Sequence, residues 1–67
     1  MVEDPRSAAL ALLQERRASV DEIWLRYWAN GGNTGPVEFE AYLYGLLEPA
    51  EFDPVVLSWA VQEVLLR

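Results

Sequence analysis

The side chains that most often carry catalysis and metal binding are missing from this sequence. It contains no cysteine, no histidine and no lysine. A nucleophilic hydroxyl needs a base beside it, usually histidine or lysine, and a structural zinc site is built mainly from thiolates and imidazoles. We therefore expect no enzyme, no metal, no cofactor and no small-molecule substrate. The hydroxyl groups that remain are those of Ser7, Ser19, Thr34 and Ser58.

Carboxylates are the most numerous reactive groups. Eleven acidic residues against five arginines give a net charge of −6. General acid–base chemistry would need a carboxyl group in a desolvated pocket, whereas the best-placed pair, Glu48 and Glu51, is expected in a loop. Three interpretations stay open for the main acidic stretch: a solvated surface that keeps the protein soluble, a docking face for a basic partner, or a decoy for nucleic acid. That stretch holds Glu38, Glu40, Glu48, Glu51 and Asp53.

A glycine-rich segment can be aligned with the calcium-binding loop of an EF-hand. With Gly35 at position six, Ala41 falls at position twelve, where calcium is normally held by a bidentate glutamate. Positions one, three and five are Asn30, Gly32 and Thr34, so no acidic ligand stands at any of the four. We interpret the segment as a turn between helices.

Helix caps and apolar spacing predict three to four helices joined by short loops. The capping box at Ser19 indicates either that a second helix begins there or that one long helix bends. The expected fold is a single all-α domain over residues 1–67, with three to four short helices in a compact bundle or an orthogonal cluster. Gly45 is expected inside the third helix as a point of close approach to another helix. The expected helices run from about Pro5 to Ala18, from Val20 to the Asn30–Asn33 turn, from Pro36 to about Leu47, and from Pro54 to the C-terminus.

The middle of the chain resembles a group of natural proteins. The segments are Trp24-Leu-Arg-Tyr-Trp-Ala-Asn-Gly-Gly and Phe39-Glu-Ala-Tyr-Leu-Tyr-Gly45. They are similar to short, functionally uncharacterised helical proteins of high-GC actinobacteria. The exclusive use of arginine over lysine also suits a GC-rich genome. This resemblance implies a source, and neither an activity nor a site.

The last segment, residues 54–67, is apolar around most of its circumference. Only Ser58, Gln62 and Glu63 interrupt it before the final arginine. A chain of this length has little surface with which to cover such a helix. We therefore expect a small protein-interaction or regulatory module that self-associates, as a homodimer with Trp59 near the seam. The predicted interface residues are Val55, Val56, Trp59 and Leu66.

Two other functions are weighed beside self-association. The same helix could dock into a larger protein. Alternatively, the second and third helices could form a helix-turn-helix module for nucleic acid, which would require Arg16, Arg17 and Arg26 to share one face. The scattered arginines and the acidic balance speak against nucleic acid. No segment is long and apolar enough to span a membrane, so we expect a cytoplasmic protein.

Overall fold

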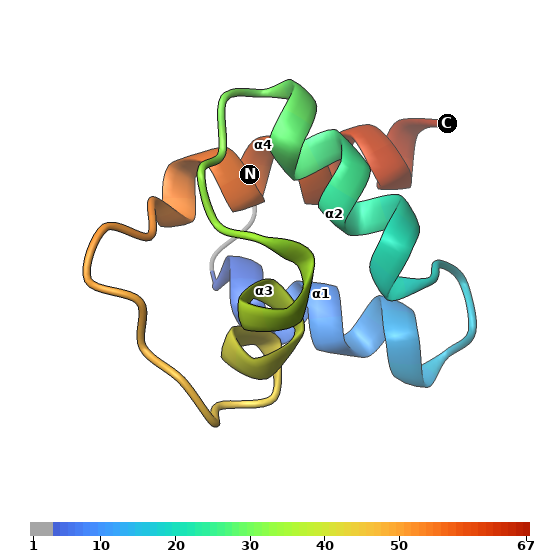
Figure 1. Ribbon diagram of the computed structural model, residues 1–67. Coiled ribbons are helices and arrows are strands. Elements are labelled where there is room, and N and C mark those ends of the chain that lie inside the picture. The colour runs from blue at the N-terminus through green and yellow to red at the C-terminus, as the bar shows by residue number, and fades with distance from the viewer. Residues whose placement is uncertain (1–3) are drawn as a thin grey trace.

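Every helix begins where the sequence places a cap. The computed structural model describes residues 4–67, which form four helices and no strand (Figure 1). The side chains of Asp4, Ser19 and Asp53 each accept a hydrogen bond from a backbone N–H of the first turn, and Gly35 caps its helix without one. The helices are α1 (Pro5–Gln14), α2 (Val20–Ala29), α3 (Pro36–Leu43) and α4 (Pro54–Leu66).

The first helix is shorter than the apolar spacing predicts, because α1 ends at Gln14 and not near Ala18. The chain turns at Arg16, which has a left-handed backbone with φ of 58°. The backbone N–H of Arg17 then donates to the carbonyl oxygen of Leu12 at 2.9 Å, which closes the end of the helix. This turn separates α1 from α2, so the two helices are not continuous.

The third helix also ends early, at Leu43 and not at Leu47. Gly45 has φ of 78°, the left-handed conformation that commonly terminates helices. A Cβ atom added at Gly45 would meet no other atom within 4 Å. The prediction that Gly45 lies at a helix–helix contact is therefore wrong. Leu46 and Leu47 lie beyond the end of α3 and are exposed in the loop that follows.

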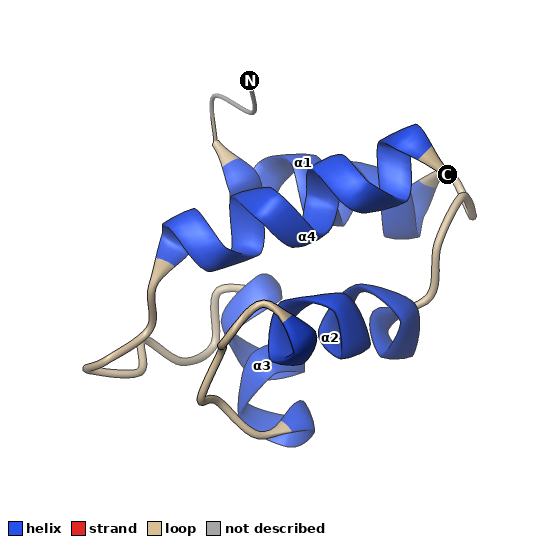
Figure 2. Ribbon diagram, turned by 90° about the horizontal axis from the view of Figure 1, so that it is seen from above, coloured by secondary structure: helices blue, strands red, loops and turns tan. Residues whose placement is uncertain are grey.

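The helices form two layers, with α1 and α4 side by side in one and α2 and α3 in the other (Figure 2). Helix α4 also packs against α2 across the layers. The side chain of Arg67 donates hydrogen bonds to the Glu22 carboxylate and to the carbonyl oxygen of Arg17. These bonds fasten the C-terminal end of α4 to the start of α2.

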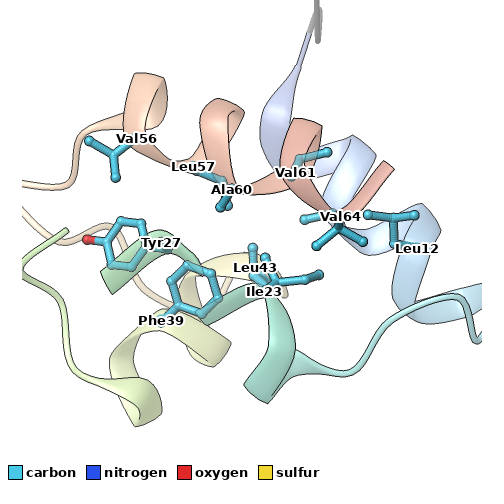
Figure 3. Packing of buried hydrophobic residues seen from close by; sticks show 11 residues of the cluster. Leu12, Ile23, Tyr27, Phe39, Leu43, Val56, Leu57, Ala60, Val61 and Val64 are labelled. Carbon is cyan, nitrogen blue, oxygen red and sulfur yellow. The ribbon is translucent and has the colours of Figure 1, made fainter. Parts of the chain in front are cut away.

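The core lies between the two layers and is built around Tyr27 (Figure 3). The Tyr27 ring packs on Phe39 and Phe52, with centroid distances of 4.9 and 5.3 Å. Its phenolic oxygen accepts hydrogen bonds from the backbone N–H groups of Asn33 and Thr34. One side chain thus joins α2, α3 and both long loops. The other buried apolar residues are Ala9, Leu12, Ile23, Leu43, Val56, Leu57, Ala60, Val61 and Val64.

Candidate interaction surface

The outward side of α4 carries large apolar side chains that the rest of the chain leaves uncovered. Val55 is 52% exposed, Trp59 48% and Leu66 84%. Together with Gln62 they are spaced at i, i+4, i+7 and i+11, which places them along one stripe of the helix. We call this stripe of four residues the α4 face. It contains no charged side chain.

One of the four predicted interface residues lies elsewhere. Val56 is only 7% exposed and belongs to the buried core. A residue next to Val55 on a helix is rotated by about 100° from it, so the two cannot share one stripe. Val56 points toward the core between the layers (Figure 3). Its inclusion in the interface is therefore a wrong prediction, whereas the structure brings Val55, Trp59 and Leu66 together.

The charged residue of α4, Glu63, is turned toward α2. Its carboxylate lies 3.6 Å from an Arg26 guanidinium nitrogen and accepts a 2.9 Å hydrogen bond from the side-chain amide of Asn30. Between the two helices lies an open groove of about 360 Å³, which we call the α2–α4 groove. Its lining residues are Glu22, Leu25, Arg26, Ala29 and Glu63.

The sequence did not predict this groove, although the position of Leu25 indicated an exposed apolar residue on one of its sides. Leu25 lies off the core stripe of α2 and is exposed, as is Ala29 one turn later. An isolated exposed leucine is ordinary on a protein surface. Only the packing of α4 beside α2 places Leu25 in a groove with Glu63, and that relationship cannot be derived from helical periodicity.

Ion pairs engage most of the arginines. Arg6 pairs with Glu48 at 3.2 Å, and Arg17 approaches Glu15 at 3.7 Å. Arg26 and Arg67 both contact Glu22, and Arg26 reaches Glu63 as well. Arg16 makes no ion pair within residues 4–67. Because four of the five cations face carboxylates, they offer little uncompensated positive charge to a phosphate backbone.

The Glu22–Arg67 pair shapes the electrostatics beside the groove. A side-chain hydrogen bond from Arg67 holds the pKa of the Glu22 carboxyl below its ordinary value, and the positive charges of Arg67 and Arg26 act in the same direction. The same hydrogen bond raises the pKa of the Arg67 guanidinium. Both groups therefore stay charged at neutral pH.

The residues of the acidic stretch make different contacts and do not form one shared site. Glu48 is paired with Arg6, and Asp53 caps α4. Glu38 folds back toward Gly35 at the start of α3, so that its carboxylate would meet a Cβ atom there. Glu38 and Glu51 both line a shallow hollow of about 410 Å³. Among residues 4–67, no cluster of three or more acidic, histidine or cysteine side chains could hold a metal ion.

Comparison with family models, curated proteins and solved structures finds no match to this chain. The resemblance to short helical proteins of high-GC actinobacteria thus stays a prediction. In the part of the chain that the structure describes, no helix is long and apolar enough to cross a membrane. The case for a function therefore depends on the surfaces described above.

Proposed function

We propose that this protein is a small interaction module that pairs with a second copy of itself through the α4 face. The observation that carries the proposal is the position of Val55, Trp59 and Leu66 on the one side of α4 that faces neither α1 nor α2. A two-fold pair is the commonest arrangement in which one apolar patch is buried by an identical one. Its role is binding and not catalysis.

The α4 face carries no charge that would oppose a second copy as the partner. Two chains that each carry a net charge of −6 repel one another unless they meet at a neutral surface. The α4 face is such a surface, because its residues are uncharged and Glu63 is engaged by Arg26 and Asn30. A basic partner would gain more from the acidic residues elsewhere. We place the module in the cytoplasm as part of the same proposal.

Sedimentation equilibrium of the wild-type chain and of the Trp59→Glu variant tests the pairing. The wild type should change from monomer to dimer with increasing concentration, and the variant should stay monomeric, because a carboxylate in an apolar interface loses its hydration. Val37→Glu is the matched control: it adds the same charge at an exposed site on α3 and should dimerise like the wild type. A wild-type chain that stays monomeric throughout the micromolar range would overturn self-association.

The helix-turn-helix alternative gains no support from the arginine positions. Its test is a titration against random duplex DNA at low salt, where non-specific phosphate attraction is strongest. We expect no binding.

A further inference from the structure

The α4 face by itself is small for a stable interface. Helix α4 has 13 residues and is therefore about 20 Å long, and one side of a helix is about 10 Å wide. A contact confined to that strip involves only the four residues of the α4 face. Standard protein–protein interfaces bury about 800 Å² of accessible surface and involve about 20–30 residues on each partner. A specific dimer therefore needs more surface than this stripe provides.

The additional surface lies directly beside the stripe. Glu63 follows Trp59 by four residues and precedes Leu66 by three, so it borders both side chains on the helix. Glu63 also forms one wall of the α2–α4 groove, whose other wall carries Leu25 and Ala29. Apolar side chains thus lie on both sides of the charged residues of the groove, on the α4 face and on the outer side of α2.

The charged side chains of the groove are already satisfied within the chain. Arg26 bridges Glu22 and Glu63 at 3.9 and 3.6 Å, and Asn30 donates a further hydrogen bond to Glu63. Covering a charge that keeps its partners costs less than covering an isolated one. The groove can therefore be covered by an apolar surface without leaving a carboxylate unpaired.

We propose that the dimer interface spans both features, with the α4 face of each copy seated in the α2–α4 groove of the other. This inference rests on the proposed self-association and names the surface that completes it. In a two-fold pair the same helix-in-groove contact is made twice, once by the helix of each copy. The two symmetric contacts together form the interface. Leu25 and Ala29 are then interface residues although they lie outside α4.

The test compares two equally charged variants by sedimentation equilibrium. Leu25→Glu should raise the dimer dissociation constant at least about tenfold, a change equivalent to about 1.4 kcal/mol. Val37→Glu replaces another exposed apolar residue by glutamate on α3 and should change it less than about threefold, since the two variants have the same net charge. Circular dichroism of both variants checks that the helices are retained.

An uncharged pair keeps the test independent of electrostatic repulsion. Leu25→Ala should also weaken the dimer, whereas Val37→Ala should not. If both Leu25 variants dimerise like their Val37 controls while Trp59→Glu stays monomeric, the groove is not part of the interface. Pairing through the α4 face would then still hold. If the wild type itself is monomeric, both proposals fall.

Discussion

Gly32 lies directly against the ring of Tyr27. A Cβ atom added at Gly32 would overlap three ring carbons of this fully buried tyrosine. The ring is fixed from its other sides by Phe39 and Phe52, so it has no space in which to retreat. The close approach of backbone to ring therefore requires glycine at position 32.

Gly32→Ala should consequently destabilise the fold by about 2 kcal/mol, the usual cost of overpacking a filled core. The measurement is urea-induced unfolding. Gly35→Ala is the control, because the added Cβ there meets only the end of the flexible Glu38 side chain. It should cost less than about 1 kcal/mol, mostly through the weaker helix cap. Equal losses in the two variants would show that the Tyr27 ring moves aside.

Tyr27→Phe should cost about 1–3 kcal/mol although it removes a single oxygen atom. That oxygen accepts hydrogen bonds from the N–H groups of Asn33 and Thr34, at 3.2 and 3.1 Å. Without it, both amides lose their partner and the turn before α3 is loosened. Hydrogen exchange should quicken first at these two amides. Unchanged protection at Asn33 and Thr34 would contradict this role of the phenol.

Alanine substitutions at Val55 and Val56 should distinguish an effect on folding stability from an effect on association. Val56→Ala should lower the free energy of unfolding by about 2 kcal/mol, because it opens a cavity among buried side chains. Val55→Ala should change it by less than about 0.5 kcal/mol, as expected for an exposed residue. Both are measured by urea unfolding at concentrations where the monomer dominates. Sedimentation should show the opposite order, because only Val55→Ala should weaken the proposed dimer.

Acid pH should lower the free energy of unfolding, in part because the Glu22 carboxylate becomes protonated. The pKa of this carboxyl is lowered from its ordinary value of 4.5 by the hydrogen bond from Arg67. Its contribution to stability is therefore complete above pH 4.5 and is lost as the pH falls through the lower folded-state pKa. Urea unfolding between neutral pH and pH 3 should show a smaller acid loss for Glu22→Gln than for the wild type. Glu40→Gln, which makes the same change at an exposed residue of α3, is the matched control.

Salt should not dissociate the proposed dimer. Raising the ionic strength from about 0.1 M to about 1 M shortens the screening length from about 10 Å to about 3 Å. Screening then reduces the repulsion between two acidic chains and leaves apolar burial intact. The dissociation constant from sedimentation should fall or stay constant. A dimer that separates at high salt would instead depend on ion pairs between the copies.

Local chemistry in the sequence was enough to place the starts of the helices. Asp4, Ser19 and Asp53 cap helices because their side-chain oxygens accept first-turn N–H groups, and this depends only on neighbouring residues. The all-α fold follows in the same way from caps and helical spacing. Helical spacing did not determine that Val55 faces outward and Val56 inward, because α4 is apolar around most of its circumference. The ends of α1 and α3 were not predicted, because left-handed turns at Arg16 and Gly45 stop them inside favourable apolar patterns.

The sequence by itself determined that this chain forms short helices and carries more apolar surface than it can cover, since composition and periodicity are local properties. Only the tertiary structure decided that Phe52 packs on Tyr27 and Tyr42 and that Leu25 shares a groove with Glu63 of α4. Those neighbours come from different helices and loops. Their contact depends on how the layers pack, which is set by all the buried side chains together.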